Sequence, residues 1–467
     1  MQTEKKHVQC AEVLGRILDA REARAARQRL FLDEFQTTLI CFTLNIAGPR
    51  KTDPLAERAF FEGKRRILRE LERAGITAIK YEETKDGAGF SGYWAVEANP
   101  ERVKHVMAAI ETSDPLGRLY DIDVLRPNGR KISRQDIGLP GRACLICGKP
   151  ATVCSRSAAH PNEEVVRRTE ELLRDYFYGQ YADRVAQAAA RAMLYEVSVT
   201  PKPGLVSREG SGAHRDMNFF TFIDSAAALT PWFRTFVLNA LRFRGCPKEL
   251  FRASRLIGLE AEDTMYRATD GINTHKGLIF SFGVLCASMG YLQGRGLPET
   301  LDSVLSLSAE MAAEAYNELG EESSAGEPTH GEKTYEKYGL PGARGEAAAG
   351  FPTAAGFALP LLRSLMEQGL SFNDAGAVVL LHLISRVDDT NAVSRSNLET
   401  YRAVQAEVQK CLNETSEPKR LLNSARGLNE EFISLNISPG GCADQLAVAF
   451  FLSFLFPGPD GAEEKTS

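Results

Sequence analysis

Long apolar runs are missing from this sequence. No stretch approaches the roughly 18 uninterrupted apolar residues that a membrane span requires, and the first ten residues are polar. We therefore expect a cytoplasmic protein without a membrane segment. In the second half neither G-x-x-x-x-G-K-[ST] nor G-x-G-x-x-G occurs, which argues against a P-loop and a Rossmann nucleotide site there.

The chain also lacks a strong charge of either sign. Its 467 residues carry a formal net charge of −5, with 27 Lys and Arg against 23 Asp and Glu up to residue 165 and 29 against 38 beyond it. A nucleic-acid binder normally shows a basic stripe, so we expect no nucleic-acid partner. Nine cysteines in so long a chain do not resemble a secreted disulfide framework, and we expect reduced thiols.

The secondary structure that the sequence predicts changes near residue 180. Before it, helical runs alternate with β-rich segments, which predicts an α/β or α+β domain. The helical runs are residues 13–35 and 59–75, and the β-rich segments are residues 37–46 and 92–98.

The second part of the chain has apolar residues at helical spacing in segment after segment, from residue 163 onward. This pattern predicts a larger all-α domain. We place the two domains at residues 1–178 and 179–467, joined through a helix. Residues 320–346 are rich in glycine and charge, and we expect them to form a long loop.

In the segment GRLYDIDVL, residues 117–125, a strand pattern places two carboxylates two positions apart. Alternating faces put Asp121 and Asp123 on one side while Ile122 and Val124 enter a core. Neighbouring carboxylates repel unless a cation or donors lie between them, and Mg2+ is often held by one or two carboxylates with substrate phosphates. The pair indicates metal-assisted phosphoryl or nucleotidyl transfer, with a solvated strand face as the alternative.

Basic and amide side chains on both sides of this pair could contact phosphate. Guanidinium groups form forked hydrogen bonds to phosphate oxygens, and a turn directly after a strand is a further plausible contact. The predicted phosphate-binding residues of this half are Asn45, Arg50, Lys51, Arg118, Arg134 and Arg142.

The first half resembles the apo-citrate lyase phosphoribosyl-dephospho-CoA transferases. The resemblance rests on REARAARQRL, TLNIAGPRK, GRLYDIDVL, ISR and RACLICGKPATVCSRSAAH, in order over roughly residues 10–165. It implies a nucleotidyltransferase-like domain that transfers phosphoribosyl-dephospho-CoA to a serine of the citrate lyase acyl carrier subunit and releases pyrophosphate. Asp121 and Asp123 would then hold Mg2+. Ala47 departs from the usual Pro before Gly-Pro, which affects turn stiffness.

Cys144, Cys147, Cys154 and His160 form the pattern C-x2-C-x6-C-x5-H. Three thiolates and an imidazole could complete a tetrahedral zinc site, but the second half lacks the paired spacing of a zinc ribbon. We therefore expect ordinary reduced core cysteines ahead of structural Zn2+. Redox chemistry ranks third, because the thioredoxin-like context is missing.

Polar residues of the second half gather in loops and at one helix start. Asn273 or Thr274 could cap an apolar helix whose N-terminus, with Lys276, would attract phosphate. The candidate site residues are Lys202, His214, Asp216, Glu262, Asn273, Thr274, His275, Lys276, Arg344, Glu346, Asp388, Asp389 and Asp444. Taken singly, each has a structural explanation as a cap, a surface pair or a turn.

Jointly these segments resemble the triphosphoribosyl-dephospho-CoA synthases, through TPKPGLVSR, GAHRDMN, TDGINTHKGLIF, YGLPGARGEAAAGFP, DDTN and GGCADQLA. That family converts ATP and dephospho-CoA to 2'-(5-triphosphoribosyl)-3'-dephospho-CoA and releases adenine. By residue chemistry, the acidic residues would lie near the ribose or bind Mg2+, and Lys202, Lys276 and Arg344 would bind the triphosphate. His214 or His275 would assist the adenine.

The sequence thus predicts a bifunctional enzyme that makes the citrate lyase prosthetic group and attaches it. One alternative is the same chemistry in service of malonate decarboxylase, which the citrate-type motifs of the first half disfavour. A second alternative is a zinc-containing adaptor without catalytic activity, which two motif-rich halves disfavour.

Overall fold

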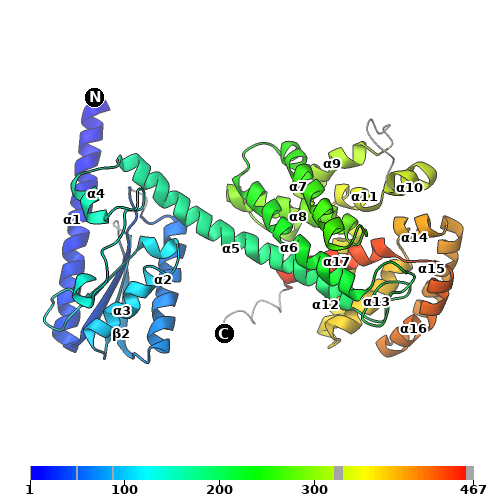
Figure 1. Ribbon diagram of the computed structural model, residues 1–467, viewed down its shortest axis with the longest axis horizontal. Helices are drawn as coiled ribbons and strands as arrows, with labels where there is room; N and C mark the ends of the chain where they lie inside the picture. The colour runs from blue at the N-terminus through cyan, green and yellow to red at the C-terminus, as the bar shows by residue number, and fades with distance from the viewer. Residues whose placement is uncertain (1, 49–50, 87–88, 320–329, 459–467) are drawn as a thin grey trace. The chain divides into compact units, whose positions relative to one another are not determined.

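The structure is a computed structural model that describes residues 2–48, 51–86, 89–319 and 330–458 (Figure 1). The chain divides into two compact units, Met1–Gly179 and Gln180–Ser467. One long helix, α5 (Asn162–Ser198), contains the point of division.

The first unit is built on a four-stranded antiparallel sheet with the strand order β2-β3-β1-β4. The strands are β1 (Thr38–Leu44), β2 (Ala78–Asp86), β3 (Gly89–Val96) and β4 (Tyr120–Leu125). The expected mixture of helices and strands is therefore present as an antiparallel sheet with helices. Strand β2 was not predicted, because none of its residues is fully buried and it shows no apolar alternation.

Helices cover both faces of this sheet (Figure 1). The helix α1 (Gln2–Phe35) contributes Phe31 and Leu32 to one face, and α2 (Pro54–Arg73) and α3 (Pro100–Ile110) pack on the other. The shorter elements of this unit are η1 (Leu116–Leu119), η2 (Gln135–Ile137) and α4 (Ala151–Arg156).

The regular elements of the second unit are all helices among its described residues, as expected, and a long loop at residues 199–218 joins α5 to the next helix. Its helices after α5 are α6 (Phe219–Arg242), α7 (Pro247–Ala268), α8 (Lys276–Arg295), α9 (Leu301–Asn317), α10 (His330–Tyr338), α11 (Gly342–Ala348), α12 (Leu359–Glu367), α13 (Phe372–Ile384), α14 (Thr390–Arg395), α15 (Leu398–Glu414), α16 (Pro418–Ser434) and α17 (Gly440–Leu455). A π-helix, η3 (Pro352–Ala358), precedes α12.

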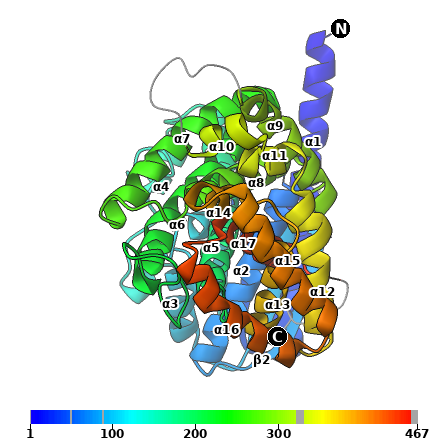
Figure 2. The ribbon, with the colours of Figure 1, turned by 90° about the vertical axis from the view of Figure 1, so that its right-hand side faces the viewer.

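Two apolar helices form the centre of this unit. Helix α17 contacts α8, α12, α13 and α14, and it lies inside the bundle (Figure 2). Helix α8 is long and apolar enough to cross a membrane, but 78% of its apolar window is buried inside the structure. Burial of this kind is expected of a core helix.

The expected loop at residues 320–346 is only partly a loop. Residues 320–329 lie outside the described residues, but α10 and most of α11 occupy the remainder. Gly339 has a φ of +69°, which suits the turn that ends α10, and Pro341 directly precedes α11. The glycines and proline that suggested a loop therefore mark the junction between two short helices.

Candidate functional sites

Strand β4 places the two predicted carboxylates on one face of the sheet. Asp121 and Asp123 are half-buried, while the alternate residues Ile122 and Val124 are fully buried. The predicted alternation along this strand is therefore confirmed. Asp123 lies opposite Cys41 of β1 in the strand register.

The two carboxylates differ in their partners. Asp123 forms an ion pair with Lys131 at 2.5 Å, whereas Asp121 forms no hydrogen bond or ion pair with any described residue. Desolvation and the charge of Asp123 raise the pKa of Asp121, and Arg142 and Lys131 partly oppose this rise. Two adjacent carboxylates, one of them without a partner, are a donor set suited to a hard divalent cation.

The free edge of β4 is covered by a buried acidic residue that the sequence reasoning missed. Glu111, at the end of α3, accepts the Ile122 backbone N–H at 2.9 Å. It also pairs with Arg134 at 2.8 Å and with Arg142. Lys104 donates to the Ile122 carbonyl at 2.7 Å from the same helix. Two of the predicted phosphate ligands thus already share a carboxylate.

The predicted arginines nevertheless lie close together. Arg118 donates to the Ala143 carbonyl, and burial together with the charges of Arg142 and Arg134 lowers its pKa. The positive charges of this region outnumber its carboxylates Glu111, Asp121 and Asp123, since they come from Arg118, Arg134, Arg142, Lys104 and Lys131. Such an excess favours binding of an anion beside β4.

The turn after β1 carries the remaining predicted contacts of this half. Asn45 is exposed and its backbone N–H donates to the Leu119 carbonyl at 2.7 Å, while Arg50 lies outside the described residues. Burial and the charges of Arg24 and Arg21 on α1 lower the pKa of Lys51. These two arginines belong to the REARAARQRL segment, and their proximity to Lys51 was not predicted.

The four predicted zinc ligands come together in the first unit. Their candidate ligand atoms all lie within 4.8 Å of one another. Cys154 is buried, but Cys144 is half-buried and Cys147 is exposed. The expectation of ordinary core cysteines therefore fits Cys154 alone, because the other two thiols do not fill a hydrophobic core.

The second unit contains a cavity of about 1180 Å³ that gathers nearly all the predicted residues of that half. This volume slightly exceeds the range of about 300–1,000 Å³ usual for small-molecule sites, which suits a nucleotide with a second large substrate. The predicted residues that line it are Lys202, His214, Glu262, Asn273, Thr274, His275, Lys276, Arg344, Glu346, Asp388, Asp389 and Asp444. Asp216 is not among them; its exposed carboxylate lies 3.7 Å from His214 Nδ1.

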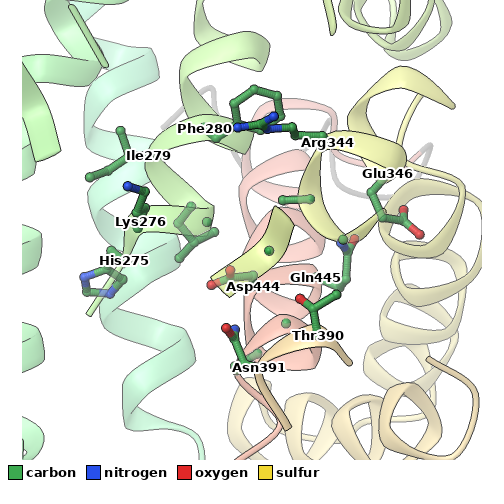
Figure 3. A pocket seen from close by; sticks show the side chains of 18 of the residues that line it. His275, Lys276, Ile279, Phe280, Arg344, Glu346, Thr390, Asn391, Asp444 and Gln445 are labelled. Carbon is green, nitrogen blue, oxygen red and sulfur yellow. The ribbon is translucent and has the colours of Figure 1, made fainter. Parts of the chain in front are cut away.

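The start of α8 forms one wall of the cavity (Figure 3). The N-cap position of α8 is His275, whose side chain does not cap the helix, and not Asn273 or Thr274 as predicted. The Asn273 side chain still accepts the Lys276 backbone N–H at 3.2 Å. Lys276 Nζ lies 2.8 Å from Glu262 Oε2, and both side chains are partly exposed. An open helix N-terminus with a lysine beside it favours an anionic group.

His275 is buried at this helix start. Its Nδ1 lies 2.8 Å from Ser225 Oγ, which also accepts a hydrogen bond from Thr274. This chain of hydroxyls favours the tautomer with the proton on Nε2, an atom without a partner among the described residues. Desolvation and the charge of Lys202 lower the pKa of His275 to about 3, so the ring is neutral at physiological pH.

Asp444, in the first turn of α17, faces the start of α8 (Figure 3). A Cβ on Gly277 would lie 2.2 Å from Asp444 Oδ2, so the carboxyl group packs directly on that glycine. It forms no hydrogen bond or ion pair with any residue that the structure describes. Desolvation and the charges of Glu196 and Asp389 raise its pKa well above the usual range.

Asp388 and Asp389 have different environments. Asp389 is buried and caps α14 by accepting the Asn391 and Ala392 N–H groups, and its other oxygen accepts the Cys442 N–H at 2.7 Å. It thereby joins the starts of α14 and α17. Asp388 is partly exposed and pairs with Arg402 at 3.2 Å.

Lys202 is engaged in a buried ion pair. Its Nζ lies 2.5 Å from Glu196 Oε1 and donates to the Glu196 carbonyl at 2.9 Å. Both side chains are nearly inaccessible, at 2% and 4% exposure. Glu196 lies within the long helix α5 and was not predicted, because an acidic residue in a helical run has no local signal of its burial.

The last predicted residues line the side of the cavity formed by α11 and η3. Arg344 pairs with Glu332 at 3.2 Å, and Glu346 accepts hydrogen bonds from the Thr353 hydroxyl and N–H. Desolvation raises the pKa of Glu346, although the Thr353 bonds oppose this. Across the cavity, His214 Nε2 lies 2.8 Å from Ser438 Oγ.

Comparisons with known proteins match both units. The family model for ATP:dephospho-CoA triphosphoribosyl transferase covers residues 182–460, and that for apo-citrate lyase phosphoribosyl-dephospho-CoA transferase covers residues 12–176.

Similar curated proteins include two full-length relatives, each called Protein CitXG. The chain is 32% identical to the one from Haemophilus influenzae, over 94% of this chain and 96% of the relative. It is 33% identical to the one from Leuconostoc mesenteroides subsp. cremoris, over 95% and 97%. A probable 2-(5''-triphosphoribosyl)-3'-dephosphocoenzyme-A synthase from Pectobacterium carotovorum is 41% identical over 57% of this chain and 88% of the relative. The chain therefore belongs to the CitXG family, in which an apo-citrate lyase phosphoribosyl-dephospho-CoA transferase precedes an ATP:dephospho-CoA triphosphoribosyl transferase.

Proposed function

We propose that this chain carries out two consecutive transfers. The helical unit joins ATP and dephospho-CoA into 2'-(5-triphosphoribosyl)-3'-dephospho-CoA and releases adenine. The sheet-containing unit then transfers phosphoribosyl-dephospho-CoA to a serine of the citrate lyase acyl carrier subunit and releases pyrophosphate. The observation that carries this proposal is the match of one chain to both families, since the product of the second unit is the substrate of the first.

In the first reaction the 2'-hydroxyl of dephospho-CoA attacks C1' of the ATP ribose. The C1'–N9 bond breaks, the hydroxyl loses its proton, and adenine departs with a proton. Carboxylates stabilise positive charge that develops on the ribose, and an acid assists the leaving base. The cavity offers both kinds of group in Glu262, Asp388 and Asp444.

We assign the proton donor for adenine to Asp444. A carboxyl group with a raised pKa holds its proton closer to neutral pH, which suits a general acid. His275 is neutral and can offer Nε2–H as a hydrogen-bond donor. This assignment replaces His275 as the acid, because a ring with a pKa of about 3 carries no extra proton at pH 7.

The triphosphate would bind at the start of α8. Lys276 and Arg344 are partly exposed and could exchange their partners Glu262 and Glu332 for phosphate oxygens. Lys202 has its charge neutralised by Glu196, so we assign it to the cavity wall and not to the triphosphate.

In the second reaction the carrier serine attacks the α-phosphorus of the triphosphoribosyl group. The new O–P bond forms, the serine proton is lost, and the bond to the β-phosphate breaks to release pyrophosphate. We propose that Asp121 and Asp123 hold Mg2+, which when bound neutralises charge on the departing pyrophosphate. Arg118, Arg134 and Arg142 add positive charge beside β4.

A cytoplasmic location suits these substrates and carriers. The eight cysteines whose side chains the structure describes are free thiols, which is the usual state in a reducing compartment.

The test is intact mass spectrometry of apo citrate lyase carrier protein incubated with this chain, ATP, Mg2+ and dephospho-CoA, with adenine followed by chromatography. We expect release of adenine and a carrier mass increase of one phosphoribosyl-dephospho-CoA. An apo malonate decarboxylase carrier in a parallel sample should be modified more slowly. Absence of both adenine and the carrier mass increase would overturn the proposal.

A further inference from the structure

The cluster of Cys144, Cys147, Cys154 and His160 has the dimensions of a metal site. In a tetrahedral zinc site with Zn–S bonds of about 2.3 Å, two sulfur ligands lie about 3.8 Å apart. Cys147 Sγ and Cys154 Sγ lie 3.5 Å apart, and all four candidate ligand atoms fall within 4.8 Å. Small movements of side chains would therefore bring all four atoms to bonding distance of one ion.

The turn that carries the first two cysteines is shaped to present sulfur. The Cys144 N–H donates to the Lys149 carbonyl at 2.6 Å, and the Gly148 N–H returns to the Cys144 carbonyl at 3.3 Å. Gly148 has a φ of +73°, which favours glycine at this position. The Ile146 N–H points to Cys144 Sγ at 3.4 Å, a contact that favours a thiolate over a thiol.

His160 supplies independent evidence for a ligand. Its Nδ1 lies 3.7 Å from Glu164 Oε2, one turn further along the chain. Its Nε2 is buried and has no hydrogen-bond partner among the described residues. Histidines that bind metals usually donate one ring nitrogen to a carboxylate and give the other to the ion.

The segment around the cluster has almost no core of its own. From residue 133 to residue 160, Cys154 is the one fully buried residue. Yet this segment carries Arg134 and Arg142, which reach Glu111 at the free edge of β4. A poorly buried segment that must hold side chains in place usually requires a crosslink or a metal.

We propose that Cys144, Cys147, Cys154 and His160 bind one Zn2+ that fixes the segment carrying Arg134 and Arg142 beside β4. On binding, the three thiols release their protons and the imidazole binds in its neutral form. All four positions of the ion are then filled by protein, so the site is structural and does not activate water.

The first measurement is metal content of the full chain, purified without chelator from zinc-supplemented growth. We expect about one zinc per chain. Replacement by Co2+ should give the intense sulfur-to-metal absorption of thiolate ligation. Cys147→Ser should remove the bound metal, whereas Cys411→Ser, a half-buried cysteine on α15, should keep it.

Two further variants separate ligation from simple packing. His160→Cys should retain zinc as a four-thiolate site, whereas His160→Ala should lose it. Glu164→Gln should weaken zinc binding about 10- to 100-fold, since it removes the carboxylate that orients the imidazole. Metal-free protein with three reduced thiols, or a Cys147–Cys154 disulfide in the freshly purified chain, would overturn the proposal.

The positioning role has its own readout, which rests on the proposed function. Removal of zinc should abolish carrier modification while adenine release by the same chain continues, so the helical unit serves as the control for folding. Unchanged carrier modification after complete removal of zinc would refute the positioning role. Zinc content does not depend on either activity, so failure of the proposed function would leave the metal test intact.

Discussion

Replacing Lys202 by Met tests whether its buried pair with Glu196 supports the fold or binds substrate. The change removes the ammonium group 2.5 Å from Glu196 Oε1 and leaves that carboxylate buried without its partner. The aliphatic part of the side chain is largely retained, so the cavity created is small. Nearly the whole effect should therefore come from charge.

The expected loss in the free energy of unfolding follows from the burial of both side chains of the pair. Breaking a buried ion pair by removing one partner typically costs about 3–5 kcal/mol, because the other charge stays uncompensated. With a urea slope of about 2 kcal/mol per M, the unfolding midpoint of the helical unit should fall by about 1.5–2.5 M. The double variant Glu196→Gln with Lys202→Met leaves no charge and should be more stable than Lys202→Met alone.

Tryptophan fluorescence can report on unfolding of the helical unit alone, because the chain has two tryptophans, Trp94 in the sheet and Trp232 in α6. In a Trp94→Phe background, urea unfolding followed by emission reports on Trp232. The control is Arg420→Met, which breaks an exposed pair with Glu417 and should cost less than about 1 kcal/mol.

The outcome can contradict this reasoning in a specific way. If Lys202→Met leaves the urea midpoint unchanged and instead raises the KM for ATP, the lysine binds triphosphate in the working enzyme. If the double variant is as unstable as Lys202→Met alone, the charge of Glu196 is not the source of the cost. Either result would refute the assignment of Lys202 to the cavity wall.

Three further outcomes are expected. Asp121→Asn should lower carrier modification, measured by intact mass, by at least about 100-fold. Adenine release, measured by chromatography, should persist. The control Asp33→Asn on α1 should change neither activity. Asp444→Asn should abolish most adenine release. The Asp444→Asn variant should also have a higher free energy of unfolding than the parent, and the difference should be larger at pH 8 than at pH 5. The pKa of Asp444 is raised in the folded protein, so the parent loses stability as the pH rises above the pKa that this carboxyl has in the unfolded chain. Gly277→Ala should push the Asp444 carboxyl away and slow adenine release. Gly427→Ala on α16, where an added Cβ meets nothing within 4 Å, should not. Equal rates for the two variants would refute the contact.

The sheet shows what periodicity can and cannot predict. Strand β4 was recognisable because the apolar Ile122 and Val124 alternate with Asp121 and Asp123. Strand β2 has no fully buried residue, and its place is set by pairing with β3. Its partner β3 begins at Gly89, three residues after β2 ends, so the Asp86-Gly87 pair is a local hairpin signal that apolar periodicity alone does not detect.

Some residues of the cavity could likewise be predicted from local sequence, and others could not. Polar residues at the start of an apolar helix predicted Asn273 and Lys276, because an open helix end is a local feature. Glu196 lies in the last turn of α5, six residues before Lys202, and only the packing of other segments buries this pair and brings Asp444 close to it. Its burial depends on tertiary contacts, which local sequence does not carry.

The arginines beside β4 show why residue type alone is ambiguous about role. Arg134 and Arg142 were predicted as phosphate ligands, and the structure has both bonded to Glu111. These two roles are compatible, because Arg118, Lys104 and Lys131 also lie in this region and the five cations outnumber the carboxylates of Glu111, Asp121 and Asp123. The shared carboxylate fixes the positions of the two arginines, and the excess charge remains available to an anion. A preorganised cation pair of this kind loses less conformational freedom when it binds phosphate than two free arginines would.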